Sequence, residues 1–101
     1  MTIVFKAKDS LVSINTQKET IWRSDKDRVN IINLKENEEI KPHIHDGNHI
    51  WVVISGKGNF LSKGSGRLIK TGTVIIAPAG EEHGVTCTTE EGLTIVSISV
   101  N

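Results

Sequence analysis

The segment Pro42-His43-Ile44-His45-Asp46-Gly47-Asn48-His49 carries three of the four histidines of the chain within seven residues. The fourth, His83, follows Pro78-Ala79-Gly80-Glu81-Glu82. Residues two apart on a strand point the same way, so His43 and His45 are expected to share a face. His49 can join them if the intervening residues turn the chain back. Because neutral imidazole binds Zn, Cu, Fe and Ni well, this spacing predicts one metal site formed by His43, His45, His49 and His83.

The rest of the chain has the pattern of an all-β protein. Segments rich in Ile, Val and Thr recur along it, separated by Gly, Asn, Asp and Ser. This pattern is typical of an antiparallel sandwich or barrel, and the absence of helical spacing predicts little or no helix. We expect tight turns at 24–27, 55–58 and 63–66. The expected strands cover residues 2–5, 11–15, 20–23, 29–34, 49–55, 59–62, 67–70, 74–77, 83–88 and 93–100.

Length and charge narrow the class of protein. The 101 residues suffice for one small domain, and the formal net charge is zero, without the basic signature of a nucleic-acid or membrane binder. No apolar run approaches the roughly 20 residues that span a bilayer. Residues 1–6 lack signal-peptide features, and the single Cys87 excludes an internal disulfide. We expect a soluble, cytoplasmic protein that acts on a small molecule, with no nucleic-acid or membrane partner, and that forms a homodimer to supplement its small core.

The histidine segments resemble the two motifs of the cupin family. The first motif is Gly, five residues, His-x-His, three or four residues, Glu, six residues and Gly. The second is Gly, five residues, Pro-x-Gly, two residues, His, three residues and Asn. The positions that correspond here are Asn37, His43, His45, His49 and Gly56, then Gly72, Pro78, Gly80, His83 and Cys87. The resemblance implies one cupin domain over residues 1–101, a double-stranded β-helix or jelly-roll barrel, with motif 1 at about 37–56 and motif 2 at about 72–87.

Three positions depart from the family motifs. Asn37 replaces a glycine, but asparagine tolerates a left-handed turn better than most residues, so the fold should survive. Cys87 replaces a polar residue and is more often a small buried filler than a functional thiol. His49 replaces the usual glutamate ligand. The site then becomes all-imidazole and resembles the four-histidine cupins, and the metal keeps its full 2+ charge, which should strengthen its Lewis acidity.

The resemblance and the ligand set lead to two alternative functions. Four protein ligands on an octahedral metal leave two open positions, which suits an oxygenase-type, dioxygenase-like oxidoreductase acting on a small chelating molecule with Fe, Mn, Ni, Cu or Zn. The competing hypothesis is a non-catalytic module that binds a metabolite or only the metal, as a sensor or partner subunit. Fold alone cannot choose between them.

Missing residue types remove some cupin activities. The chain has no tyrosine. The His–Tyr acid–base pair of sugar-epimerase cupins and the Cys–Tyr crosslink of some thiol dioxygenases therefore have no carriers. Auxiliary acid–base help would have to come from Cys87, Glu81 or Glu82. We interpret Trp51 and Phe60 as core residues rather than platforms that stack on a substrate.

Overall fold

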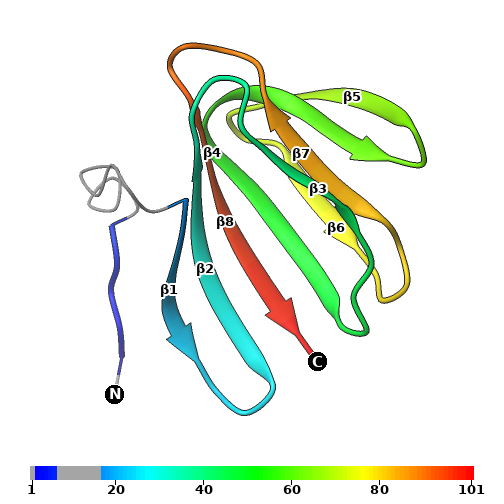
Figure 1. Ribbon diagram of the computed structural model, residues 1–101. Coiled ribbons are helices and arrows are strands. Elements are labelled where there is room, and N and C mark those ends of the chain that lie inside the picture. The colour runs from blue at the N-terminus through cyan, green and yellow to red at the C-terminus, as the bar shows by residue number, and fades with distance from the viewer. Residues whose placement is uncertain (1, 7–16) are drawn as a thin grey trace.

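The computed structural model describes residues 2–6 and 17–101, in which every regular element is a β-strand (Figure 1). None of these residues forms a helix that is long and apolar enough to cross a membrane. The all-β prediction is confirmed. The strands are β1 (Lys18–Arg23), β2 (Asp27–Leu34), β3 (Glu39–His43), β4 (Asn48–Ser62), β5 (Ser65–Lys70), β6 (Val74–Ala77), β7 (His83–Cys87) and β8 (Leu93–Val100).

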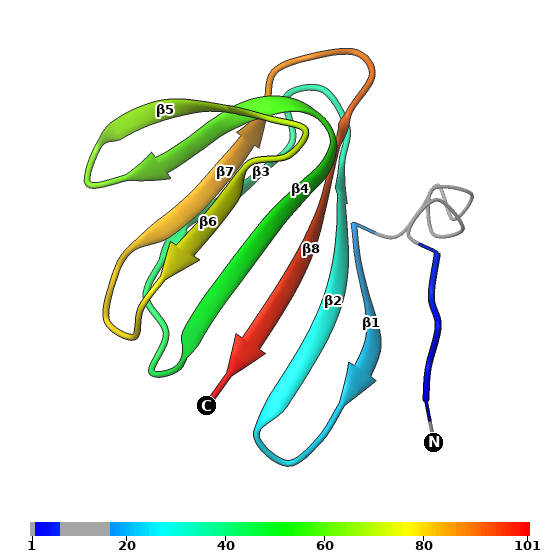
Figure 2. The ribbon, with the colours of Figure 1, turned by 180° about the vertical axis from the view of Figure 1, so that it is seen from behind.

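The strands form two antiparallel sheets that face each other and share β4. The first sheet runs β1-β2-β8-β4-β6, and the second contains β3, β7, β5 and the second half of β4. Figures 1 and 2 show β3, β5 and β7 curling over the open face of the first sheet. This is the jelly-roll arrangement that the sequence predicts. The barrel is open at the end where β3 finishes and β7 begins.

The 15-residue strand β4 corrects one prediction, because residues 55–58 lie inside it and do not form a tight turn. The first half of β4 pairs with β6 and β8, and the second half pairs with β5 and β7. The register against β8 shifts between Val53 and Ser55, and Gly56 has φ 94°. A Cβ at Gly56 would collide with the carbonyl oxygen of Gly92. Glycine therefore lets β4 bend from one sheet into the other without ending.

Most other local predictions agree with the structure. Lys63 and Gly64, both with positive φ, form the turn between β4 and β5, and Ser24 and Asp27 close the β1–β2 connection through hydrogen bonds. Asn37 has φ 70°, the left-handed conformation expected of it. The predicted strand at 2–5 is wrong, because these residues have no regular structure, and β3 was missed. The expected strand at 11–15 lies outside the described residues.

The interior of the barrel is organised in rows that cross β2, β8 and β4. Residues paired across neighbouring antiparallel strands point to the same face. The pairing gives an apolar row, Ile32–Ile95–Val53, each residue at most 3% exposed. The next row is Asn30–Ser97–Trp51, and the row nearest the open end is Arg28–Ser99–His49. The core is completed by Leu34, Ile69, Val85, Cys87 and Leu93.

Candidate metal centre

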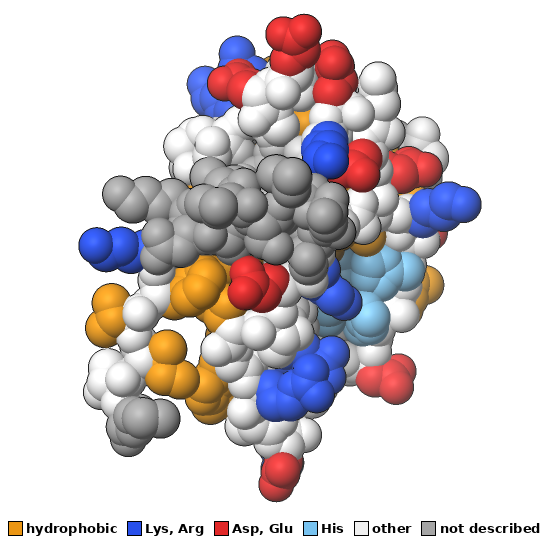
Figure 3. Space-filling view, turned by 60° about the vertical axis from the view of Figure 1, so that its left-hand side comes forward, with side chains coloured by type: hydrophobic (Ala, Val, Ile, Leu, Met, Phe, Trp, Pro, Cys, Tyr) orange, Lys and Arg blue, Asp and Glu red, His pale blue; other side chains and the backbone are white. Residues whose placement is uncertain are grey.

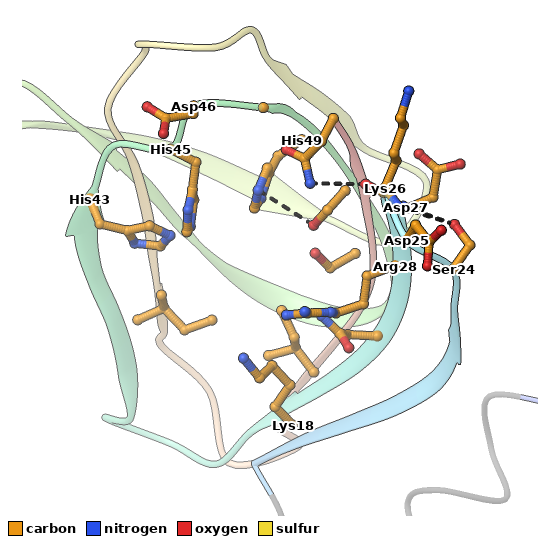
Figure 4. A pocket seen from close by; sticks show the side chains of 17 residues that line it. Lys18, Ser24, Asp25, Lys26, Asp27, Arg28, His43, His45, Asp46 and His49 are labelled. Carbon is orange, nitrogen blue, oxygen red and sulfur yellow. Dashed lines mark hydrogen bonds between the residues drawn. The ribbon is translucent and has the colours of Figure 1, made fainter.

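The four histidines come from three strand ends and one loop around the open end of the barrel, and Figure 4 shows three of them, His43, His45 and His49. His43 is the last residue of β3 and His83 the first residue of β7, and the two are paired in register. His45 lies in the loop that follows β3, and His49 lies near the start of β4, in the first sheet. The site is therefore built between the two sheets.

Three of the imidazoles converge closely enough to share a metal ion. One ligating nitrogen from each of His43, His45 and His83 lies within 4.8 Å of the other two. The ring centroid of His43 is 4.4 Å from that of His45 and 4.5 Å from that of His83. Of these three side chains, His83 is fully buried at 1% exposure, His43 is partly buried and His45 is exposed. The group therefore extends from the core to the solvent.

His49 lies against this group without belonging to the 4.8 Å set. Its ring stacks on that of His45 with a centroid distance of 4.3 Å and an interplanar angle of 12°, and lies 4.9 Å from the His83 ring. Its Nε2 is 3.4 Å from Ser99 Oγ, and its Nδ1 is buried with no partner among the described residues. The structure thus brings all four predicted residues together, with one nitrogen from each of three within 4.8 Å of the others and His49 beside them.

Backbone carbonyls hold two of the rings in the tautomer that a metal needs. His43 Nδ1 donates to the Lys41 carbonyl at 2.8 Å, and His83 Nδ1 donates to the Glu81 carbonyl at 2.9 Å. A carbonyl can only accept, so each Nδ1 carries the proton and each Nε2 keeps its lone pair. His83 Nε2 is buried and has no partner among the described residues. A buried lone pair without a donor, beside two other imidazoles, fits a metal ion.

The surroundings of three of the imidazoles favour their neutral form. Burial, followed by the charges of His45, His83 and His43, lowers the pKa of His49 from 6.5 to about 4. Burial also lowers the pKa of His83, and partial removal from water, with His43, His83 and Lys18 nearby, lowers that of His45. Neutral imidazole is the form that binds a metal, so the lowered pKa values of His45, His49 and His83 favour metal binding.

A pocket of about 380 Å³ opens beside the imidazoles. His43, His45 and His49 line one side of it, and the polar residues Asn30, Ser97 and Ser99 line another. In the space-filling view the imidazoles reach the surface next to Lys and Arg side chains (Figure 3). The pocket gives a small molecule direct access to the place where the imidazole nitrogens converge.

The proposed auxiliary residues lie elsewhere. Cys87 is completely buried in the core, with its thiol 3.4 Å from the Thr89 carbonyl. The Glu82 carboxylate accepts a hydrogen bond from the Lys63 backbone N–H, and the side chain of Glu81 is exposed. None of the three is among the residues that line the pocket. Their role in acid–base chemistry stays a prediction without structural support.

Trp51 has the core position that its sequence context suggests. Its side chain is 3% exposed, its ring contacts that of His83 edge-on at a centroid distance of 5.2 Å, and its Nε1 donates to Ser97 Oγ at 3.0 Å. Phe60 packs against the same core. The supporting residues Ser97, Ser99 and Arg28 were not identified from sequence. The signal that points to them is the pairing of β2 with β8 and of β8 with β4, which becomes visible only in three dimensions.

The sequence profile of the family described as "Cupin domain" matches residues 30–99. Together with the two-sheet barrel, this match shows that the chain belongs to the cupin family. A comparison with curated protein sequences found no significant match. The family and the histidine cluster identify a cupin domain whose residues are compatible with a metal site.

Solved structures share the fold. An uncharacterized conserved protein with a double-stranded β-helix domain from Klebsiella pneumoniae has a TM-score of 0.87 at 23% identity, over 99% of this chain and 90% of that one. An RmlC-like cupin protein from Desulfovibrio desulfuricans has a TM-score of 0.74 at 24% identity, over 82% and 79%. KdgF from a Halomonas species has a TM-score of 0.72 at 19% identity, over 83% and 77%. At these identities the likeness establishes the fold.

Proposed function

We propose that this cupin binds one divalent transition metal through His43, His45, His83 and His49, and that it is a dioxygenase-type enzyme for a small chelating molecule. The observation that carries the proposal is the convergence of three imidazole nitrogens within 4.8 Å at the wall of an open pocket. An imidazole-only set suits Fe, Mn, Ni, Cu or Zn, of which the redox-active ions suit reaction with dioxygen. His49, stacked on His45 beside the three imidazoles, would be the fourth ligand.

In this proposal the histidines bind the metal, and the neighbouring residues orient the histidines. The carbonyls of Lys41 and Glu81 hold His43 and His83 with Nε2 directed away from the backbone. Trp51 fixes His83 from the core side and keeps water from that side of the ring. A bound redox metal would supply Lewis acidity and electron transfer between a chelated substrate and dioxygen. When both oxygen atoms enter the product, the substrate is the electron donor and no separate reductant is needed.

Metal content tests the first half of this proposal. Protein purified without added metal should contain about one transition metal per chain by elemental analysis, and His83→Ala and His45→Ala should remove it. Glu39→Ala is the control, because Glu39 is exposed on β3 and distant in register from the imidazoles. Unchanged metal content in both histidine variants would refute the metal centre.

Oxygen consumption tests the second half. The Fe, Mn, Ni and Cu forms should be screened in an oxygen electrode against diketones and catechols, which chelate metals through two oxygen atoms, and against thiols, which bind metals through sulfur. Uptake of dioxygen that depends on both metal and substrate supports the dioxygenase. Absence of uptake in all four metal forms contradicts it.

The alternative is a metal- or metabolite-binding module without catalysis. One observation favours it. Among the described residues the pocket lining contains no Cys, Tyr or Glu, so it offers little for proton transfer besides imidazole, the carboxylates of Asp and three basic side chains. Tight binding of a chelating ligand with no oxygen uptake would establish this function.

We also propose that the chain forms a homodimer and resides in the cytoplasm. The outer face of the first sheet supports self-association, because Val74 and Ile76 of β6 are 56% and 68% exposed. Ile76 is paired with Ile50, and Val74 with Val52, so the apolar surface continues onto β4. Light scattering should give the mass of two chains, and Ile76→Glu should reduce it to one.

A further inference from the structure

The row of residues at the open end of the barrel places a cation opposite the histidines. Arg28 of β2 is paired with Ser99 of β8, and Ser99 is paired with His49 of β4. These three residues therefore point to the same interior face. Lys18 of β1 is paired with Ile32, which is 3% exposed and belongs to the interior, so Lys18 also points inward. The strand pairing itself directs both cations into the pocket.

The side chains follow this direction. Lys18 and Arg28 both line the pocket, and Figure 4 shows them extending toward the side occupied by His43, His45 and His49. The figure also shows Asp25 and Asp27 grouped with Ser24 and Lys26 at the outer end, away from the two cationic head groups. Within residues 2–6 and 17–101, no carboxylate forms an ion pair with Lys18 or Arg28.

Lys18 and Arg28 are exposed side chains on inward-pointing strand positions, which is unusual in a barrel. Asp25, Asp27 and Asp46 also line the pocket, but none of them pairs with either cation. A strand offers outward positions at every second residue, where Lys and Arg are normally placed and fully solvated. Their charges would add to that of a metal bound at the histidines, so the part of the cavity between the two head groups and the histidines would attract an anion. Arg presents a planar fork of donors that matches a carboxylate with two parallel hydrogen bonds.

We propose that Arg28, assisted by Lys18, is the anion-binding half of the pocket, and that the ligand is a small molecule with a chelating group at one end and a carboxylate at the other. This inference rests on the metal centre proposed above and names its substrate class. Arg28 and His49 are two strands apart, or about 10 Å from backbone to backbone. With both side chains extending into that space, a molecule of a few carbon atoms bridges the metal and the guanidinium.

A matched pair of ligands tests the inference by calorimetry. Malate and 2-hydroxybutyrate share the same chelating hydroxy-carboxylate and the same four-carbon chain, but malate ends in a carboxylate where 2-hydroxybutyrate ends in a methyl group. Co²⁺ binding to the protein is measured first, and then the binding of each ligand to the Co²⁺ form. We expect malate to bind at least about 10-fold more tightly, the effect of one charge-assisted bidentate contact.

Variants identify the residue responsible. Arg28→Gln should reduce the preference for malate to about 2-fold or less while leaving the Kd of 2-hydroxybutyrate and of Co²⁺ unchanged. Lys18→Gln should reduce it by a smaller factor. Arg67→Gln is the matched control, because it removes the same charge from the exposed face of β5, outside this pocket, and should keep the full preference. Thermal melting of each variant checks that the fold is retained.

The outcomes separate the anion subsite from the metal centre. Equal binding of the two ligands by the unmodified protein, or a full malate preference in Arg28→Gln, overturns the anion subsite. Failure of Co²⁺ to bind contradicts the metal centre instead. In that case malate is titrated into the metal-free protein, where binding that depends on Arg28 supports the anion subsite and absence of binding overturns it.

Discussion

Two interior rows of the barrel cross the same three strands and have opposite chemistry. Ile32, Ile95 and Val53 close the middle of the barrel with apolar side chains that are nearly inaccessible. Four residues further along each strand, Arg28, Ser99 and His49 form the polar end. Both rows obey the same alternation along β2, β8 and β4. The face that a residue occupies is thus set by strand periodicity, whereas its position along the strand decides between core and pocket.

The largest effect is expected from the apolar row. Ile95→Ala removes a side chain that is 0% exposed and surrounded by core residues, so it should lower the free energy of unfolding by about 3 kcal/mol. Urea denaturation measures the loss. If the two rows are independent, the folded variant keeps its metal affinity. A loss below about 1 kcal/mol would mean that the core collapses around the missing atoms.

The polar row is tested by replacing its histidine. His49→Ala should weaken metal binding by roughly 10- to 100-fold, since His49 contacts His45 and His83 at the edge of the three-imidazole set. His49→Glu should restore most of the affinity, because a carboxylate is a good ligand at the same distance from the backbone. Competition with a coloured chelator gives both values. Full affinity in His49→Ala would define a three-histidine centre with His49 as a neighbour.

The two rows differ in how far their residues can be predicted from the sequence. Motif spacing brings the four histidines together, although His45 lies in the loop after β3, where the strand alternation expected of it does not apply. The Lys63–Gly64 turn and the left-handed Asn37 follow from local residue chemistry. The polar row was not predictable, because Arg28, Ser99 and His49 meet only through non-local pairing. Gly56 misled for a related reason. A glycine-rich segment favours a turn. Here Gly56 instead allows β4 to bend, because the carbonyl oxygen of Gly92, far away in the sequence, leaves no room for a side chain.

Acid should act on the histidines at the polar end of the barrel and not on the apolar row. The pKa of His49 falls from 6.5 in the unfolded chain to about 4 in the folded protein, and those of His45 and His83 are also lowered, all three with burial as the largest cause. Between pH 6.5 and 4 the unfolded chain therefore binds more protons, so the metal-free protein loses stability as the pH falls through this range and is unaffected above about pH 7.5.

Urea midpoints at pH 7.5, 6 and 5 measure this dependence. His49→Gln should make it weaker, because the group with the large downward pKa shift is gone. The apolar-row variant Ile95→Ala should keep the dependence of the unmodified protein, displaced to lower stability. Identical midpoints at pH 7.5 and 5 in the unmodified protein would show that the imidazoles are solvated in the folded state.

The smallest effects come from two serines in adjacent rows of β8, and they should separate stability from metal binding. Ser97 accepts the hydrogen bond of Trp51 Nε1 at 3.0 Å in a buried position, so Ser97→Ala leaves a buried donor unpaired and should cost about 1–2 kcal/mol of stability.

Ser99 instead contacts His49 Nε2 at a longer 3.4 Å beside the pocket. Ser99→Ala should cost less than about 1 kcal/mol of stability, but loosen His49 and weaken metal binding by up to about 10-fold. Urea denaturation and the chelator competition, applied to both variants, measure the two quantities independently. If both serines affect stability alone, His49 does not depend on Ser99 for its orientation, and the polar row contributes to the metal centre only through the histidine itself.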